Sequence, residues 1–267
     1  FFLQALDSTI LNTALPAMAK SLGESPLQMQ SVIVAYSLTT AMLIPASGWV
    51  ADRFGTQRVF AWAIALFVLG SVLCALSPSL KFLIAARVVQ GVGGAMMLPV
   101  GRLAVLRNHP KGDFIRAMSF IAIPAQVGPM LGPTLGGWLV EVASWNWVFW
   151  INVPVGLFGI WATRRWMPGS PQIAPRKFDG VGYALLSFGM VAISVALDGL
   201  SGMGFGMAQV LVLMVFGLAS LASYWMHALR VPEPLFAPVL FRVRSLRVGL
   251  LGNLFARFGS GAAPFLM

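Results

Sequence analysis

Charged side chains are scarce in this sequence of 267 residues. Only 10% of them are Asp, Glu, Lys or Arg, against roughly 25% in ordinary soluble domains, whereas 58% are hydrophobic. So little charge excludes a water-soluble enzyme, and so much hydrophobicity excludes an intrinsically disordered chain. The composition instead predicts helices packed in a lipid bilayer, where the 28 Gly and 17 Pro are better tolerated than in soluble helices.

Cysteine, histidine and acidic residues are also few. The one cysteine, Cys74, lies in an apolar stretch without a partner for an internal disulfide, so we expect a small buried side chain there. His109 and His227 are expected to be solvated loop residues, because neither has the spacing of a metal ligand. The eight acids are dispersed, whereas a membrane enzyme should cluster them. The phosphate loop G-x-x-x-x-G-K-[ST] is absent, and we expect no metal and no cofactor.

Long hydrophobic stretches, in contrast, are abundant. A bilayer core requires about 20 mostly apolar residues per helix, and short polar breaks divide the chain into nine such stretches. Two of them are incomplete, because the chain opens on Phe1 and closes on Met267 within apolar sequence. The expected spans cover residues 1–18, 27–50, 59–76, 80–99, 117–140, 147–163, 181–197, 208–225 and 246–267. The sequence therefore predicts an all-α integral membrane protein, and a fragment of a longer one.

The basic residues that give the net charge of +10 are distributed unequally between the breaks. Breaks after the even-numbered spans contain fourteen Lys or Arg, and breaks after the odd-numbered spans contain only Lys20 and Lys81. By the positive-inside rule the basic side is cytoplasmic. We therefore place in the cytoplasm the loops around residues 51–58, 102–116, 164–179 and 227–247. The basic residues form no single face for nucleic acid.

The break between the second and third spans reads GWVADRFGTQRV, residues 48–59. Its glycines suit a tight reversal, and Asp52 is placed to cap the next helix. The segment resembles the loop signature G-x-L-A-D-R-x-G-R-K of the major facilitator superfamily of secondary transporters at Gly48, Ala51, Asp52, Arg53 and Gly55. It departs from that signature at Thr56 and Gln57, where the family has basic residues. A positive-inside hairpin without further meaning is the alternative.

The fourth span contains LIAARVVQGVGGA, residues 83–95. A charge within hydrocarbon costs at least ~2.5 kcal/mol, so Arg87 should face a cavity or a counter-charge. The segment resembles the fourth-helix signature R-x-x-Q-G-x-G of the same superfamily, which is associated with proton coupling. That resemblance implies a coupling role for Arg87 and a place in the cavity for Gln90. A purely structural arginine, bonded to backbone carbonyls, is the alternative.

The fifth span contains GPMLGPTLGG, residues 128–137. Glycine recurs there every four residues, which predicts a smooth ridge that a neighbouring backbone can approach closely. Pro129 and Pro133 remove backbone donors and should bend the helix. The pattern resembles the signature G-x-x-x-G-P-x-x-G-G of the antiporter branch, whose members export drugs and metabolites. It comprises Gly128, Pro129, Gly132, Pro133, Gly136 and Gly137.

Three further segments resemble the multidrug branch with fourteen spans: LDSTILNTALP, WNWVFWINVPVG and RKFDGVGYALL, at residues 6–16, 145–156 and 176–186. The resemblance covers essentially the whole chain. It implies a monomeric drug:proton antiporter of the bacterial inner membrane, working by alternating access and driven by the proton gradient. The implied domains are an N-terminal six-helix bundle, a linker with an inserted helix pair, an amphipathic linker and the first helix of a C-terminal bundle, at residues 1–163, 164–226, 227–245 and 246–267.

Three charges remain within the spans and away from their ends: Asp7, Arg87 and Arg257. Asp7 lies nine residues before Pro16, about 14 Å of helix, and Arg87 lies about 9 Å from Lys81. The first helix runs outward and the fourth inward, so these two side chains can meet near mid-membrane. We hypothesise that Asp7 binds and releases a proton, because burial favours its neutral form and Arg87 or the substrate favours its charged form. A structural Asp7, bonded to Asn12 or to neighbouring helices, is the alternative.

The substrate class stays open at this stage. Arg257 lies about 15 Å into the last span, and in the superfamily that helix faces the central cavity. A cationic drug would be favoured by Asp7 and aromatic walls, whereas a small organic anion would prefer Arg87 and Arg257. A membrane enzyme or scaffold without transport activity is the third possibility. The polar candidates for the cavity are Asn12, Gln90 and Gln126.

Overall fold

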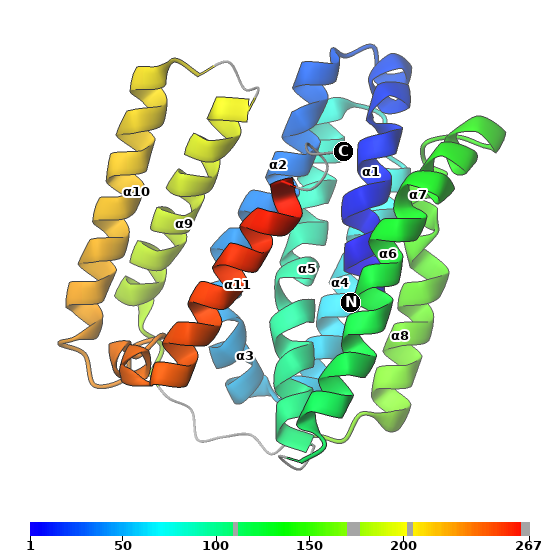
Figure 1. Ribbon diagram of the computed structural model, residues 1–267. Coiled ribbons are helices and arrows are strands. Elements are labelled where there is room, and N and C mark those ends of the chain that lie inside the picture. The colour runs from blue at the N-terminus through cyan, green and yellow to red at the C-terminus, as the bar shows by residue number, and fades with distance from the viewer. Residues whose placement is uncertain (109–111, 170–176, 202–204, 263–267) are drawn as a thin grey trace.

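The computed structural model describes residues 1–108, 112–169, 177–201 and 205–262, and the regular elements within them are all helices (Figure 1). They lie where the hydrophobic stretches predicted them, which confirms the all-α fold class. The helices are α1 (Phe2–Leu22), α2 (Pro26–Leu43), η1 (Ile44–Ala46), α3 (Ser47–Phe54), α4 (Thr56–Ala75), α5 (Leu80–Asn108), α6 (Phe114–Val142), α7 (Trp147–Trp150), α8 (Asn152–Trp166), α9 (Gly180–Ser201), α10 (Met207–Ala228), η2 (Pro238–Arg242) and α11 (Arg244–Ala262).

In the part of the chain that the structure describes, five helical segments are long and apolar enough to cross a membrane: Pro26–Phe54, Thr56–Ala75, Leu80–Asn108, Gly180–Gly199 and Met207–Ala228. The first of them combines α2, η1 and α3. Helices α1 and α6, of 21 and 29 residues, are also long enough to span a membrane. Helix α1 carries several polar residues, and α6 is rich in glycine and proline. Five of the nine expected spans thus meet this criterion of length and hydropathy within the described residues.

The turn between α1 and α2 follows directly from its sequence. Gly23 ends α1 in the left-handed conformation, with φ 68°, and its N–H donates to the carbonyl of Ala19. Ser25 then caps α2 in a reciprocal pair with Gln28, and Pro26 takes the first helical position, where no N–H is needed. These signals together fix a short reversal between two antiparallel helices.

The predicted glycine reversal between the second and third spans is located at Gly55. Its φ of 86° and ψ of 139° lie in the region that favours glycine, and α4 begins at the next residue. Gly48, in contrast, lies inside α3, where a Cβ would meet open space. The expectation that Asp52 caps α4 is wrong: α4 has no side-chain cap. Helix α3 continues to Phe54, so the Asp52 carboxylate is directed elsewhere.

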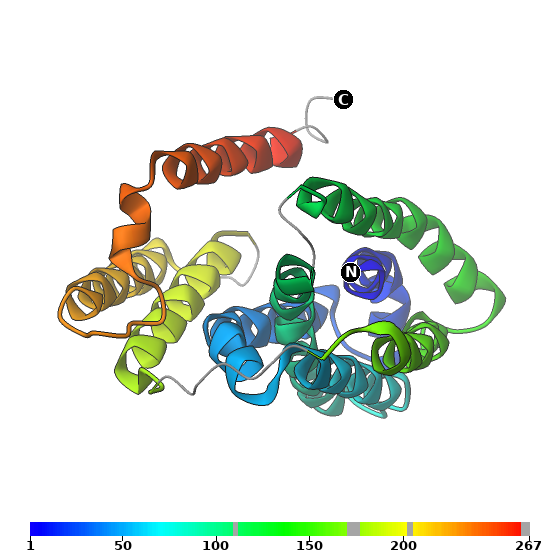
Figure 2. The ribbon, with the colours of Figure 1, turned by 90° about the horizontal axis from the view of Figure 1, so that it is seen from below.

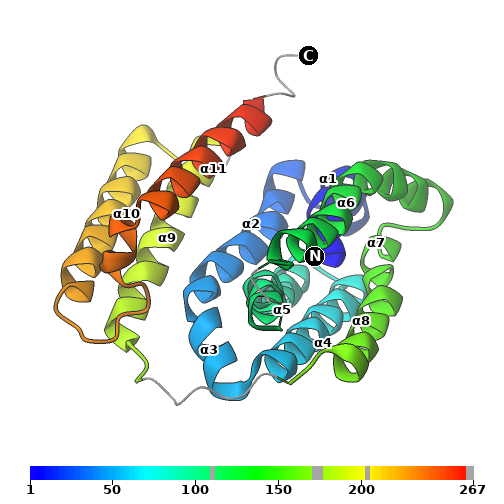
Figure 3. The same cartoon turned by 60° about the horizontal axis from the view of Figure 1, so that its bottom comes forward.

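Helices α1 to α8 pack into one bundle, and α9 and α10 form an antiparallel pair beside α2 (Figures 1 and 2). The Ser187 hydroxyl of α9 donates to the Met42 carbonyl at 2.8 Å, which fixes the pair to α2. Helix α11 packs against η2 and is set apart on another side of the molecule (Figures 2 and 3). The N-terminus lies part-way along the bundle, so α1 runs only through its upper part in Figure 1.

The predicted glycine ridge is present on α6 and packs against α1. Gly128, Gly132 and Gly136 are buried, and a Cβ on Gly128 would lie 2.9 Å from the backbone nitrogen of Leu6. A Cβ on Gly132 would overlap Thr9. Pro129 and Pro133 are exposed, and α6 remains helical through both prolines.

Substitution of Gly128 by alanine tests this helix crossing. We expect Gly128→Ala to lower the free energy of unfolding by about 1–3 kcal/mol, because the new methyl group forces α1 away. Gly137→Ala is the matched control, since nothing lies within 4 Å of a Cβ there, and it should leave stability unchanged or slightly raised. Thermal unfolding in detergent measures both variants, and equal melting temperatures for the two would contradict the close crossing.

Candidate functional site

Asp7 and Arg87 form a buried ion pair between α1 and α5. Arg87 Nη1 lies 2.7 Å from Asp7 Oδ2, and the side chains are 1% and 0% exposed. The two helices thus bring together the charges whose depths in the membrane had been matched from the sequence. Removing two ions from water costs several kcal/mol each even after relaxation, so this pair requires further partners.

Gln90, one turn after Arg87 on α5, is the first of these partners. Its Nε2 donates to Asp7 Oδ1 at 3.0 Å and to the Ser71 hydroxyl of α4 at 2.8 Å. Its Oε1 accepts a hydrogen bond of 2.5 Å from Arg87 Nη1. The close approach of α4 depends on Gly70, where a Cβ would lie 2.5 Å from the backbone of Gln90.

Asn152, at the start of α8, supplies a second donor to the same carboxylate oxygen. Its Nδ2 lies 3.3 Å from Asp7 Oδ1 and 3.3 Å from the Ser71 hydroxyl. Asp7 Oδ1 therefore accepts from two amides, and Oδ2 accepts from the guanidinium. Such a set of donors stabilises the carboxylate, not the protonated acid.

The guanidinium of Arg87 has two more partners, both from α2. Its Nε donates to the Val32 carbonyl at 3.3 Å, and its carbon lies 4.4 Å from the centre of the Tyr36 ring. A cation over an aromatic face is stabilised when it is desolvated. The network thus joins α1, α2, α4, α5 and α8 around one charge pair.

Sequence reasoning missed three members of this network: Tyr36, Ser71 and Asn152. Asn152 lies in the segment WNWVFWINVPVG. That segment indicated a resemblance to the multidrug branch, but the side-chain amide of Asn152 was not considered as a polar group. Ser71 is isolated in apolar sequence, and Tyr36 ends an apolar run before Ser37. Their one signal was polarity at mid-span, where each unsatisfied group is costly.

The other candidates for the cavity lie outside the network. Asn12 on α1 and Gln126 on α6 are exposed. Asp7 therefore does not bond to Asn12. Of the two structural roles considered for Asp7, bonding to Asn12 is excluded and bonding to neighbouring helices remains. Arg257 belongs to α11, and its side chain lies outside the described part of the structure. Cys74 is buried, as expected, and its thiol points to Gln90 Oε1 at 3.8 Å.

The loop signature forms a second polar cluster, at the end of the bundle drawn lowest in Figure 1. Asp52 forms an ion pair with Arg107 from the end of α5, and both side chains are partly exposed. Arg53 is exposed, with its guanidinium 5.4 Å from the Trp49 ring. Gln57, where the superfamily has a basic residue, donates to the Met167 carbonyl at 2.8 Å after the end of α8.

The solvated position expected for His227 is wrong, because this residue lies in the last turn of α10. Its Nε2 is 2.8 Å from the Oδ1 of Asp179, before α9, and its side chain is 22% exposed. The pair closes one end of the α9–α10 hairpin. His109 lies outside the described residues.

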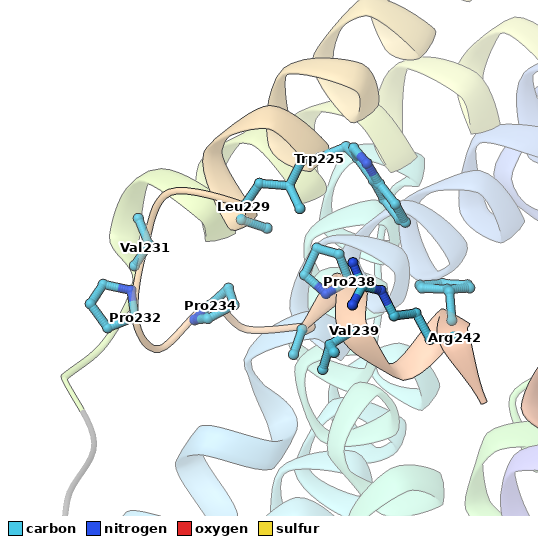
Figure 4. A pocket seen from close by; sticks show the side chains of 11 residues that line it. Trp225, Leu229, Val231, Pro232, Pro234, Pro238, Val239 and Arg242 are labelled. Atoms are coloured by element: carbon cyan, nitrogen blue, oxygen red, sulfur yellow. The ribbon is translucent and has the colours of Figure 1, made fainter.

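The segment after α10 lines an open cavity of about 490 Å³ (Figure 4). Figure 4 shows Trp225, Leu229 and Pro238 around it, with Arg242 at one side. The Tyr224 hydroxyl donates to the Phe236 carbonyl at 2.9 Å and accepts from its N–H at 2.7 Å, so this segment is fixed to α10. The cavity lies away from the Asp7 network, and the described residues contain no cluster suited to a metal ion.

Comparison with known proteins places these features in a family. The family model of the Major Facilitator Superfamily matches residues 1–266. The chain belongs to the Major Facilitator Superfamily. This is a family of transporters and not of enzymes.

The curated relatives extend the match over the whole chain. A protein of Serratia proteamaculans (strain 568), named "Putative multidrug resistance protein MdtD", is 54% identical over 266 residues. A protein of the same name from Yersinia enterocolitica is 51% identical. The match covers 100% of this chain and 56% of each relative, so the chain spans a little over half of their length.

Solved structures of the superfamily share the fold at low sequence identity. A peptide transporter of the POT family, crystallised with sulfate, superposes with a TM-score of 0.59 at 18% identity over 86% of this chain and 52% of the other. The human organic anion transporter MFSD10 gives a TM-score of 0.53 at 15% identity, over 84% and 68%. Both matches support the helical arrangement and nothing finer.

Removal of Arg87 tests how far the network depends on the ion pair. We expect Arg87→Met to destabilise this superfamily member by about 3–5 kcal/mol, because the carboxylate of Asp7 is then buried without its counter-charge. The double variant Asp7→Leu with Arg87→Met should recover much of that loss. Arg102→Met, at an exposed arginine of the same helix, is the control. Unfolding in detergent measures all three, and a double variant no more stable than Arg87→Met would refute the coupling.

Proposed function

We propose that this chain is the N-terminal part of a proton-coupled multidrug exporter, which exchanges drugs for protons by alternating access. The observation that carries the proposal is the buried Asp7–Arg87 pair, because an ionisable pair within apolar helices is costly and marks a proton or substrate pathway. The names of the curated relatives, multidrug resistance proteins, support the choice of substrate. No organic cofactor is needed, since the proton gradient supplies the energy.

In the proposed mechanism Asp7 carries the proton. As a carboxylate it accepts from Arg87, Gln90 and Asn152, and these bonds hold α1 against α5 and α8. A proton on Asp7 removes the counter-charge of Arg87 and weakens this attachment. The bundle then has a different conformational preference in each protonation state, which is what coupling to a gradient requires.

The glycine ridge of α6 supports this role. Asp7 lies between the contacts that Gly128 makes with Leu6 and those that Gly132 makes with Thr9. The absence of side chains on the ridge sets the depth at which α1 rests on α6. We infer that the signature of the antiporter branch positions the proton-binding helix rather than binding substrate.

The proposed domains keep the boundaries expected from the sequence. Residues 1–163 form the first transport bundle, residues 164–226 the linker and inserted pair, residues 227–245 a surface linker, and residues 246–267 the first helix of a second bundle. The protein is proposed to act as a monomer in the bacterial inner membrane, in contact with lipid. The ends of α3, α5, α8 and α10 then face the cytoplasm.

Neutralising Asp7 tests the proposed function. We expect Asp7→Asn to abolish efflux of a lipophilic cation driven by a pH gradient, because the amide binds no proton. Everted vesicles containing the complete transporter, with an imposed gradient, provide the measurement. Asp113→Asn, at an exposed acid before α6, should keep full activity.

Three results would contradict this proposal. Undiminished proton-coupled efflux by Asp7→Asn would remove Asp7 from the mechanism. Transport of a citrate-like carboxylate instead of the cation would replace multidrug export with export of a small organic anion. No response of either substrate to the gradient would favour a membrane protein without transport activity.

The proposed orientation is tested by cysteine labelling. Arg58 and Lys81 are both exposed. Arg58 lies at the start of α4 and Lys81 at the start of α5, so they are at opposite ends of this antiparallel helix pair. In spheroplasts we expect a membrane-impermeant maleimide to label Lys81→Cys at once and Arg58→Cys only after permeabilisation. The unsubstituted chain provides the blank, because Cys74 is buried. Labelling of Arg58→Cys in intact spheroplasts would reverse the topology.

A further inference from the structure

Protonation of Asp7 poses a hydrogen-bonding problem that the described network does not solve in its present arrangement. The carboxylate accepts from Arg87, Gln90 and Asn152. The protonated acid must donate one hydrogen bond, and a buried donor without an acceptor costs its full desolvation penalty. A group that carries the proton through the membrane therefore needs an acceptor within reach of Asp7.

Most acceptors around Asp7 are already engaged. Gln90 Oε1 accepts from Arg87 Nη1 and from the thiol of Cys74. The Ser71 hydroxyl accepts from the amides of Gln90 and Asn152. The Tyr36 hydroxyl has no hydrogen-bond partner, but it lies where a Cβ on Gly94 would contact it, about 6 Å along α5 from Gln90.

Two buried amide oxygens have no hydrogen-bond partner among the described residues, those of Gln4 and Asn152, and of these two amides only that of Asn152 bonds to Asp7. Asn152 Oδ1 is buried and has no hydrogen-bond partner among the described residues, and Asn152 itself is 0% exposed. The nitrogen of the same amide contacts Asp7 Oδ1 at 3.3 Å. Rotation of the amide by half a turn about its Cβ–Cγ bond exchanges the two atoms and brings the oxygen to Asp7.

We infer that Asn152 is a positioning residue whose side-chain amide has a different orientation in each protonation state of Asp7. With Asp7 ionised, Nδ2 donates to Oδ1 of the carboxylate. When Asp7 takes up a proton, the acid O–H donates to Asn152 Oδ1 in the turned orientation. This inference rests on the proposed role of Asp7 as the proton-binding group.

Ser71 makes the rotation possible without loss of its own bond. A hydroxyl both donates and accepts, so Ser71 accepts from Nδ2 in one orientation and donates to Oδ1 in the other. One polar atom of the amide lacks a partner in either orientation, so the turn exchanges an unpaired oxygen for an unpaired nitrogen. The number of unsatisfied groups therefore stays the same.

The titratable groups that face Asp7 do not replace this function. They are Tyr36 from α2, Cys74 from α4 and Arg87 from α5. Helix α6 contributes its glycine ridge at this level, and α8 contributes the amide of Asn152. Arg87 has only donors and cannot accept from the acid.

Loss of the amide should affect the two states of Asp7 unequally. In Asn152→Leu the carboxylate keeps Arg87 and Gln90 and loses one bond of 3.3 Å, which is at the long end for a hydrogen bond. The protonated acid loses the acceptor that the turned amide would supply. Proton binding should become about tenfold weaker, which moves the titration midpoint about one unit toward lower pH.

Infrared spectroscopy of the purified protein in lipid nanodiscs tests this inference. The carbonyl band of protonated Asp7, identified by its absence in Asp7→Asn, is followed against pH. We expect a lower midpoint in Asn152→Leu and a midpoint nearer the parent in Asn152→Gln, which keeps an amide. Asn146→Leu is the matched control, because Asn146 donates to the Ala75 carbonyl at 2.6 Å and takes no part in the Asp7 network.

The outcomes separate the two proposals. An unchanged or higher midpoint in Asn152→Leu would overturn the role of Asn152. A parent protein in which Asp7 never titrates would overturn the proposed function itself.

A second measurement needs no substitution at Asn152. In protein labelled with ¹³C at the asparagine side-chain carbonyls, one amide band should shift to lower frequency as Asp7 is protonated, and it should be constant in Asp7→Ala. A band that does not respond to pH while Asp7 titrates would also refute the turning amide.

Discussion

The bundle is organised around one charge pair that has no access to water. Asp7 and Arg87 are held 2.7 Å apart in surroundings where an unpaired charge would cost more than most single contacts contribute to stability. A buried pair of this kind adds little to stability compared with apolar side chains of the same volume. Its presence therefore imposes demands on its neighbours: every remaining lone pair and N–H requires a partner, and those partners must come from other helices. The polar atoms of Gln90, Ser71 and Asn152 meet that demand.

Glycines bring these partners within reach. Lipid provides no hydrophobic driving force between helices, so close packing and hydrogen bonds hold them together. Gly70 allows α4 to approach Gln90, and Gly128 and Gly132 allow α6 to support α1 on either side of Asp7. A Cβ at any of these positions would lie 2.9 Å or less from an atom of the neighbouring helix, so the two helices would have to move apart. The small residues and the polar residues therefore act together. The glycines determine how closely the helices approach, and that distance determines which polar side chains can form hydrogen bonds.

The sequence predicted the features that follow from hydropathy, periodicity and depth along a helix, and it failed where a partner on another element has no such signal. Hydropathy located the spans, and the rise of 1.5 Å per residue placed Asp7 and Arg87 at compatible depths. The glycine ridge followed from a repeat of four. Asp52 was misplaced because its partner, Arg107, lies 55 residues away on α5. His227 was misread because its partner, Asp179, lies before α9, 48 residues earlier in the sequence. Asn152 contacts Asp7 across 145 residues of sequence, and no local pattern encodes such a distance.

The location of the network also limits how a proton on Asp7 can affect the rest of the protein. Every described side chain that bonds to Asp7 belongs to α5 or α8, within the bundle of α1 to α8, and α9 to α11 contribute none among the described residues. A change of charge at Asp7 therefore acts first on the attachment of α1 to α5 and α8. Protonation of Asp7 also leaves the charge of Arg87 without its counter-charge, which raises the electrostatic potential around the pair. Helix α1, which rests on the glycine ridge of α6, is the element that the network releases.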